Sequence, residues 1–126
     1  MPNETLQAKA LKKVLIVEDE GEMCLLLNIL LNGEEMELEH VKTLEKACER
    51  LESVTPDVVI LDNKLPGGYG IDLITYLKKN RPSTRIIMIS GFDGAAKDVA
   101  LEAGADHYLE KPFTKEQLFE AVNSVL

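Results

Sequence analysis

Hydrophobic and polar residues follow one another along the chain in blocks that predict strands and helices in turn. Two short runs, Val14 to Val17 and Val58 to Leu61, are apolar throughout, as expected of strands covered on both faces. The segment Glu20 to Asn32 has the apolar spacing of an amphipathic helix, with a predicted inward face of Met23, Leu26, Leu27, Leu30 and Leu31. Gly33 is the expected end of this helix. Met36 to Val41 alternates apolar and charged residues, which predicts a half-exposed edge strand.

The same alternation continues to the end of the chain. Thr43 is the predicted N-cap of a second helix, which Thr55-Pro56 ends and which buries Leu44, Ala47, Cys48 and Leu51. After the loop Pro66-Gly67-Gly68, we predict a helix over Ile71–Lys79 that ends before Pro82, and then a strand over Arg85–Ser90. The next predicted helix ends at Gly104 and has an inward face of Ala96, Val99, Ala100 and Ala103, and a strand over His107–Leu109 follows it. The last predicted helix begins with a Thr114–Gln117 capping box and buries Leu118, Ala121, Val122 and Val125.

Five strands that alternate with five helices predict an α/β fold, a doubly wound parallel sheet covered on both faces. The most apolar strands belong in its centre and the strand Met36 to Val41 at its edge, which gives the strand order 2-1-3-4-5 with right-handed crossovers. Such sheets bind ligands beyond the carboxyl ends of the strands at the switch point, here between strands one and three. Glu18, Asp19 and Asp62 all follow those two strands. Helices one and two should cover opposite faces, so Cys24 and Cys48 are expected to lie too far apart for a disulfide.

Length and charge narrow the class of protein. A chain of 126 residues is long enough for one domain. Its net charge of −8, from 14 basic and 22 acidic residues, argues against direct binding to nucleic acid, which requires a basic surface. No apolar run is long enough to span a membrane, and Met1 to Lys13 lacks the apolar core of a signal peptide, so we expect a cytoplasmic protein without a membrane partner.

The predicted cluster of acids indicates a metal site. Two carboxylates about 4 Å apart repel by about 4 kcal/mol at an effective dielectric constant of about 20, so a compensating cation is needed. Mg²⁺ fits best, because it uses one or two carboxylates together with water and phosphate oxygens. Lys111, after the fifth strand, adds a fixed positive charge, and Ser90, at the end of the fourth, adds a hydroxyl. Together these groups are typical of phosphoryl transfer to an aspartate, which would form an acyl phosphate.

Four segments at the strand ends resemble the receiver domain of bacterial response regulators, the phosphorylated partners in two-component signal transduction. They are Val-Glu-Asp-Glu (Val17 to Glu20), Leu-Asp-Asn-Lys-Leu-Pro-Gly-Gly-Tyr-Gly (Leu61 to Gly70), Ile-Ser-Gly (Ile89 to Gly91) and Tyr-Leu-Glu-Lys-Pro-Phe (Tyr108 to Phe113). The resemblance implies a flavodoxin-like (βα)5 fold and divides the chain into an N-terminal extension, residues 1–12, and a receiver domain, residues 13–126.

The resemblance also implies roles for individual residues. Asp62 matches the phosphoacceptor, Asp19 the direct metal ligand, Glu18 an acid that acts on the metal through water, and the backbone carbonyl of Lys64 the third protein ligand of Mg²⁺. Lys111 matches the lysine that binds the phosphoryl group, and its bond to Pro112 would be cis. Asp62, Ser90 and Lys111 would thus carry the chemistry.

Ser90 matches the switch hydroxyl and Tyr108 the switch aromatic residue, although Tyr108 could equally be an ordinary half-buried strand residue. The phosphoryl group would come from a phosphohistidine of a sensor histidine kinase or a histidine phosphotransfer domain. The surface of helix four, strand five and helix five would then change and be recognised by an output protein that the sequence does not identify. Such a domain catalyses its own phosphorylation and dephosphorylation without being a conventional enzyme.

The sequence departs from the family pattern in one place, since the spacing from Ser90 to Lys111 is one residue shorter than is common. Lys64 and Phe92 are bulky residues expected beside the phosphoryl group, and we hypothesise that they limit attack by water. Two other functions remain as alternatives, a receiver-like interaction module that is not phosphorylated and, less favoured, a phosphatase of the haloacid dehalogenase type. Nucleotide binding is disfavoured because the acidic Glu18–Glu20 segment replaces the glycine-rich loop that would bind phosphate.

Overall fold

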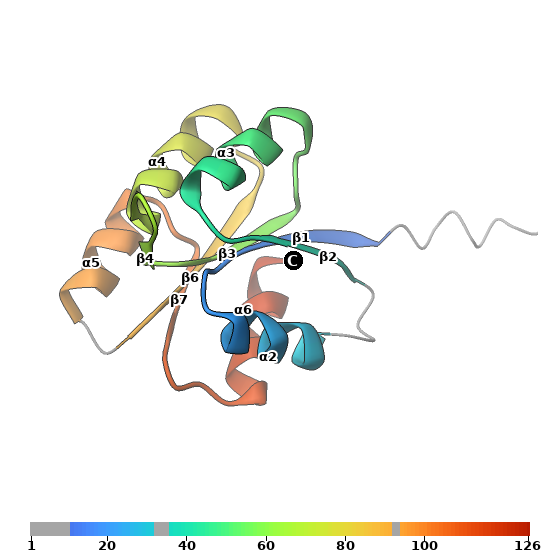
Figure 1. Cartoon of the computed structure of the whole chain (residues 1–126). Coiled ribbons are helices and arrows are strands. Elements are labelled where there is room, and N and C mark those ends of the chain that lie inside the picture. Colours follow the sequence, from blue (N-terminus) through green and yellow to red (C-terminus); the bar gives the residue numbers. More distant parts are fainter. Residues whose placement is uncertain (1–10, 32–35, 92–93) are drawn as a thin grey trace, which may run out of the picture.

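The computed structural model describes residues 11–31, 36–91 and 94–126, and it contains a five-stranded parallel sheet with helices on both faces (Figure 1). The sheet strands are β1 (Lys12–Val17), β2 (Met36–Val41), β3 (Val58–Asp62), β6 (Arg85–Ser90) and β7 (His107–Glu110). The helices are α2 (Gly21–Leu31), α3 (Leu44–Ser53), α4 (Gly70–Asn80), α5 (Gly94–Ala103) and α6 (Lys115–Val125). The strand order β2-β1-β3-β6-β7 confirms the predicted order 2-1-3-4-5.

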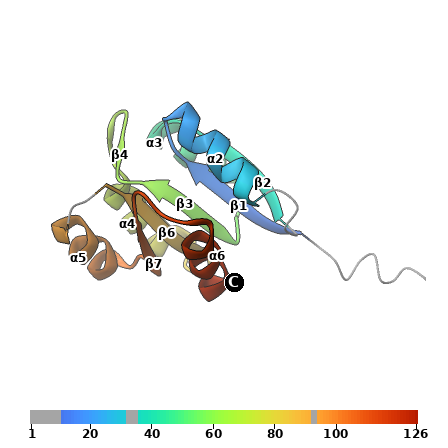
Figure 2. The same cartoon turned by 90° about the horizontal axis from the view of Figure 1, so that it is seen from below.

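Two separate hydrophobic cores fill the space between the sheet and its helices. Helices α3, α4 and α5 pack on one face, and α2 and α6 pack on the other. Figure 2, seen from below, has α2 and α6 in front of the strands. Alternate residues of β1 serve the two cores, since Leu15 and Val17 face α3 and α4, whereas Val14 and Ile16 face α2 and α6. The central strands are therefore apolar throughout because both of their faces are covered.

The predicted arrangement of the cysteines is confirmed. Cys24 lies on α2 and Cys48 on α3, which cover opposite faces of the sheet, and both thiols are free. The predicted caps are also present. The Thr43 side chain accepts a hydrogen bond from the backbone of Lys46, and Thr114 and Gln117 form a complete capping box at the start of α6.

Two predicted inward residues are exposed. On α2 the buried residues are Cys24, Leu27 and Leu31, whereas Leu26 is 39% exposed. Nearly every position from Met23 to Leu31 is apolar, so periodicity alone could not decide which stripe of this helix faces the core. Val99 of α5, also predicted inward, is 50% exposed. The predicted helix end at Gly33 lies outside the described residues.

The buried face of α5 is narrow. Two of its alanines, Ala96 and Ala100, are buried, and Ala103 is partly buried against the same core. Because an alanine side chain is a single methyl group, this helix covers little apolar area compared with its neighbours, which bury leucines. The expectation of a weakly held fourth helix is consistent with this packing.

The loop predicted at Pro66-Gly67-Gly68 is the turn of a small hairpin. Strands β4 (Lys64–Leu65) and β5 (Gly68–Tyr69) pair antiparallel, and Gly67 has a φ of 89°. This conformation is favourable for glycine and strained for other residues. Figure 2 shows the hairpin projecting beyond the end of β3.

Helix α4 begins immediately after this hairpin and starts close to the end of β3. A Cβ atom at Gly70 would overlap the Leu61 side chain and the backbone oxygen of Asp62. The glycine therefore permits the close approach that places α4 beside Asp62. No helix within the described ranges is long and apolar enough to cross a membrane.

Candidate functional site

Four strands end at the same edge of the sheet and bring four polar side chains together there. Glu18 directly follows β1, Asp62 is the last residue of β3, Ser90 is the last residue of β6, and Lys111 directly follows β7. Glu18, Asp62 and Ser90 are buried, and Lys111 is partly buried. A cavity of about 540 Å³ opens at this edge, and its lining residues are Asp19, Glu20, Asp62, Asn63, Lys64, Ser90, Gly91 and Lys111. The predicted site is therefore assembled from the predicted strand ends.

Lys111 lies among three carboxylates. Its Nζ is 3.1 Å from Glu20 Oε1, 3.5 Å from Asp62 Oδ1 and 3.7 Å from Glu18 Oε1. Each of these three acids also offers a carboxylate oxygen within 4.8 Å of the other two. Among the residues that the structure describes, no other cation lies within ion-pair distance of them. The cluster therefore has excess negative charge, and its oxygen donors suit a hard divalent cation such as Mg²⁺.

The pKa values of the two buried acids are raised, first by burial and then by the neighbouring negative charges. Burial raises the pKa of Glu18 to about 7, and the charge of Asp62 adds to this effect, although a hydrogen bond from the Glu20 backbone N–H and the charge of Lys111 oppose it. Burial likewise raises the pKa of Asp62, against the opposing effects of Lys111 and of the Asn63 backbone N–H, which donates to Asp62 Oδ1 at 2.9 Å. A bound cation would lower the pKa of both carboxylates, because it favours their charged forms.

The pKa of Lys111 is shifted in the direction that keeps the side chain charged. Burial works against the ammonium ion, but the charges of Asp62 and Glu18 and the contact with Glu20 outweigh it and raise the pKa. Lys111 is therefore a permanent positive charge at this edge of the sheet over the physiological pH range.

The remaining predicted residues lie at different distances from this cluster. Asp19 and Lys64 line the same cavity and are exposed to solvent, and the charge of Asp19 contributes to the raised pKa of Asp62. Tyr108, on β7, is partly buried and packs against the core under α4 and α5, and it is not among the residues that line the cavity. The Lys111–Pro112 peptide bond is cis, as the resemblance implies. Phe92 lies outside the described residues.

Sequence reasoning missed two residues that bring polar side chains to the cavity, Glu20 and Asn63. Glu20, not Asp19, completes the compact group of three acids, and its Oε1 is the carboxylate oxygen nearest to the Lys111 ammonium. Its place beside Glu18 and Asp19 was the available signal. Asn63 is also buried, and its side-chain oxygen has no hydrogen-bond partner within the part of the chain that the structure describes. A single asparagine after a strand provided no signal of this kind.

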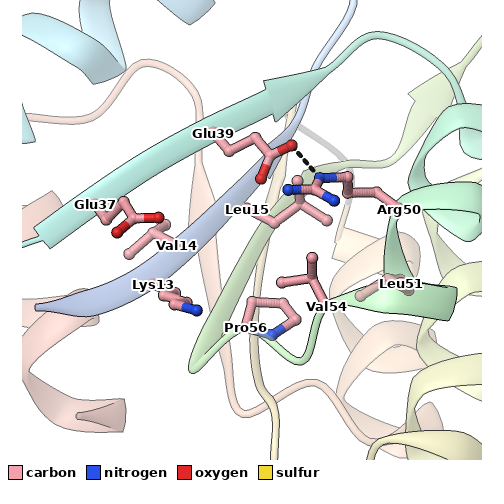
Figure 3. A pocket seen from close by; sticks show the side chains of 9 residues that line it. All are labelled: Lys13, Val14, Leu15, Glu37, Glu39, Arg50, Leu51, Val54 and Pro56. Atoms are coloured by element: carbon pink, nitrogen blue, oxygen red, sulfur yellow. Dashed lines mark hydrogen bonds and ion pairs between the residues drawn. The ribbon is translucent and has the colours of Figure 1, made fainter.

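A second, much smaller cavity of about 60 Å³ lies between β1, β2 and α3 (Figure 3). Its lining combines apolar side chains with the charged residues Lys13, Glu37, Glu39 and Arg50, and the Arg50 guanidinium contacts the Glu39 carboxylate. Figure 3 shows this pair bridging the edge strand β2 and helix α3. Its small volume and the pairing of Glu39 with Arg50 are typical of a structural cavity.

Comparison with known proteins agrees with this geometry. The model of the response regulator receiver domain matches residues 14–123. The chain is 33% identical over 116 residues to the response regulator protein PilR of Pseudomonas aeruginosa, covering 91% of this chain and 26% of that protein. It is 38% identical over 100 residues to the KDP operon transcriptional regulatory protein KdpE of Escherichia coli, covering 79% of this chain and 44% of that protein. The chain thus spans less than half of the length of these two relatives.

Solved structures of similar fold point the same way. A crystal structure of a putative response regulator from Chloroflexus aurantiacus superposes with a TM-score of 0.86 at 30% identity, covering 91% of this chain and 97% of that one. The beryllofluoride-activated NtrC4 receiver domain gives a TM-score of 0.86 at 30% identity, covering 91% and 96% of the two chains. Family model, relatives and fold agree with the cluster of acids and lysine at the carboxyl ends of the strands, and the chain belongs to the response regulator receiver domain family.

Proposed function

We propose that this domain accepts a phosphoryl group on Asp62 in a Mg²⁺-dependent reaction and passes the signal on through its surface. The observation that carries this proposal is the position of Asp62, which ends β3 at the cavity with its Oδ1 3.5 Å from the Lys111 ammonium and within 4.8 Å of two further acids. In this family the acidic pocket binds Mg²⁺, and the donor set here fits that ion. We propose residues 13–126 as the receiver domain and residues 1–12 as an N-terminal extension, which the family match over residues 14–123 supports.

The chemical step is a transfer of phosphorus from nitrogen to oxygen. Asp62 Oδ1 accepts a hydrogen bond from the Asn63 backbone N–H, which fixes the orientation of the carboxylate, and a carboxylate oxygen of Asp62 attacks the phosphorus. A new O–P bond forms while the P–N bond of a donor phosphohistidine breaks, and the imidazole leaves with the bonding electron pair. Lys111 binds the oxygens of the incoming phosphoryl group and offsets their charge. The domain is thus a partner in its own modification and not a conventional enzyme.

Glu18, Asp19, Asp62 and the backbone carbonyl of Lys64 are the proposed ligand set for Mg²⁺, Glu18 acting through water. When bound, the ion neutralises the charge that the phosphoryl oxygens bring to the acids. The raised pKa values of Glu18 and Asp62 support this assignment, because a bound cation would favour the charged forms that burial disfavours.

The signal is proposed to leave through α5, β7 and α6. Moving an equilibrium from 1:99 to 99:1 takes about 5.5 kcal/mol. One hydrogen bond from the Ser90 hydroxyl to a charged phosphoryl group supplies only about 1.5–3 kcal/mol, so Lys111, the metal and repacking of Tyr108 have to contribute. Helix α5 buries mainly alanines and exposes Val99 and Leu101, which makes it the element most easily displaced.

The partners follow from this chemistry. The donor is proposed to be a sensor histidine kinase or a histidine phosphotransfer domain, and the recipient an output protein or output domain. The net charge of −8 argues that this domain does not itself contact nucleic acid, although KdpE is named as a transcriptional regulatory protein. The domain spans less than half of KdpE, so any DNA contact in such a relative can lie in a part that this chain does not match.

The intact mass of the protein after incubation with acetyl phosphate and Mg²⁺ tests the proposal. We expect one added phosphoryl group on the wild-type protein, its loss on treatment with hydroxylamine, and no addition to Asp62→Asn. The absence of phosphorylation in the wild type with Mg²⁺ present would support the alternative of an interaction module that is not phosphorylated.

A further inference from the structure

The nearest partner of the Lys111 ammonium is an exposed acid that none of the proposed roles uses. Glu20 Oε1 lies 3.1 Å from Lys111 Nζ, compared with 3.5 Å for Asp62 and 3.7 Å for Glu18. The Glu20 side chain is 62% exposed, whereas Glu18 is almost completely buried. The contact joins the segment between β1 and α2 to the segment after β7 across the mouth of the cavity.

The backbone of Glu20 is held so that its side chain reaches this position. Its N–H donates to Glu18 Oε2 at 3.1 Å, and its carbonyl accepts the backbone N–H of Cys24 at 3.0 Å, in the first turn of α2. The residue is thus anchored on both sides by its own backbone. Its carboxylate extends over the cavity toward Lys111 from this fixed point.

A lysine ammonium has three N–H donors, and here Glu20 and Asp62 lie within hydrogen-bond distance of it, while Glu18 at 3.7 Å is an ion-pair contact. A phosphoryl group on Asp62 brings several charged oxygens that compete for these donors, so an existing contact is given up when more than one of these oxygens binds Lys111. Releasing Glu18 or Asp62 would leave a buried carboxylate with less compensating positive charge, which is costly. Releasing Glu20 leaves a carboxylate that water can solvate, because that side chain is exposed. The exchange therefore favours Glu20 as the contact that is lost.

We propose that Glu20 is a positioning residue that holds the Lys111 ammonium at the mouth of the cavity. When a phosphoryl group binds to Lys111, the ion pair between Glu20 and Lys111 breaks. This inference rests on the proposed phosphorylation of Asp62. It adds that the Glu20 carboxylate competes with the phosphoryl group for the Lys111 ammonium. Glu20 thereby lowers the affinity of the site for a phosphoryl group, and its removal releases Lys111. In this arrangement Glu20 is not a ligand of Mg²⁺, although its carboxylate belongs to the same compact group of acids.

Three variants separate these roles. Glu20→Gln removes the charge at nearly constant size. Glu20→Asp keeps the charge but shortens the side chain by one methylene, which weakens the contact with Lys111. Glu22→Gln is the matched control, because Glu22 is an exposed acid in the first turn of α2 and its loss changes the net charge equally. Glu22 is not among the carboxylates within ion-pair distance of Lys111 in the described part of the chain.

Beryllofluoride with saturating Mg²⁺ is the probe, and its affinity is measured by isothermal titration calorimetry. We expect Glu20→Gln to bind beryllofluoride about three- to fivefold more tightly than the wild type, since an exposed ion pair has about this strength, and Glu20→Asp to shift the same way. Glu22→Gln should remain near the wild type. In the absence of any ligand, the Nζ resonance of Lys111 should shift in Glu20→Gln and not in Glu22→Gln.

Titration with Mg²⁺ alone distinguishes the positioning role from metal binding. The Mg²⁺ affinity of Glu20→Gln should stay within about twofold of that of Glu22→Gln. A tenfold or greater loss in Glu20→Gln would make Glu20 a metal ligand and overturn the inference. Equal beryllofluoride affinities in Glu20→Gln and Glu22→Gln would overturn the inference alone. If the wild type does not bind beryllofluoride, the proposed function is overturned and this inference with it.

Discussion

The acidic residues at the two ends of the parallel strands are used in opposite ways. At the amino-terminal ends of the strands (the amino edge), Asp57 accepts a hydrogen bond from the Lys13 backbone N–H at 2.8 Å. Asp106 at the same edge accepts from the Ile86 N–H at 2.9 Å and from the Arg85 guanidinium at 3.2 Å. Each of these carboxylates has donors of its own, and each ties the start of one strand to its neighbour. The amino edge is therefore arranged for stability.

At the carboxyl edge, the acids instead share one cation. Glu18 and Asp62 are buried and lie close to each other and to Glu20, and among the described residues the cation within ion-pair distance of all three is the Lys111 ammonium. The pKa of both buried acids is raised, which means that the folded protein resists their ionisation. The comparison shows that the same residue type stabilises the fold at one edge and opposes it at the other. The carboxyl edge gives up stability at the site where we propose that a cation and a phosphoryl group bind.

The largest expected effect is on the pH dependence of stability. The pKa of Glu18 is raised from 4.5 to about 7 in the folded protein, so the folded state binds more protons than the unfolded state between these values. Stability is therefore greatest at the low end of this window and falls as the pH rises through it. The contribution of Glu18 is at most about 3 kcal/mol, and Asp62 acts in the same direction.

Urea unfolding of the wild type and Glu18→Gln at steps from pH 4.5 to 7.5 measures this effect. Relative to the variant, the wild type should lose stability as the pH rises, and saturating Mg²⁺ should flatten the difference because the ion favours the charged form. A constant difference in the free energy of unfolding between the two proteins across this range would show that the pKa of Glu18 is not raised by folding.

At the amino edge we expect a smaller effect, in which removal of an acid lowers the stability of the fold. Asp106→Ala removes the acceptor for the buried Ile86 N–H and for Arg85, so the free energy of unfolding should fall by about 2 kcal/mol. Asp98→Ala, at an exposed position on α5, is the control and should change little. Denaturant unfolding gives the stability, and phosphorylation by acetyl phosphate should be retained. A stabilising effect of Asp106→Ala would contradict the contrast between the two edges.

The smallest effect concerns the helices that begin at the carboxyl edge. Helix α6 has the complete Thr114–Gln117 capping box, whereas α4 follows Tyr69, whose side chain makes no capping hydrogen bond. Tyr69 is also exposed, so its replacement removes little packing. Tyr69→Ser should be more stable than Tyr69→Ala by about 1 kcal/mol, since serine can accept a hydrogen bond from the first turn. Thermal unfolding of the two variants measures the difference, and equal melting temperatures would mean that α4 gains nothing from a cap there.

Most of the fold and the membership of the site could be predicted from the sequence. The apolar strands and the edge strand have distinct patterns, and the rule that parallel strands end at a common edge places Glu18, Asp62, Ser90 and Lys111 together. The hairpin at Lys64–Tyr69 was missed because each of its strands has only two residues. The inward stripe of α2 was also misplaced, because that helix is apolar over most of its circumference.

The sequence by itself therefore determined which residues reach the carboxyl edge, since strand order and chain direction depend on patterns that extend over whole elements. Only the tertiary structure decided how these residues share their charges. The choice of Glu20 as the nearest partner of Lys111 depends on differences of a few tenths of an ångström between segments 91 positions apart. Such differences arise from the paths of two loops, which local sequence patterns do not specify.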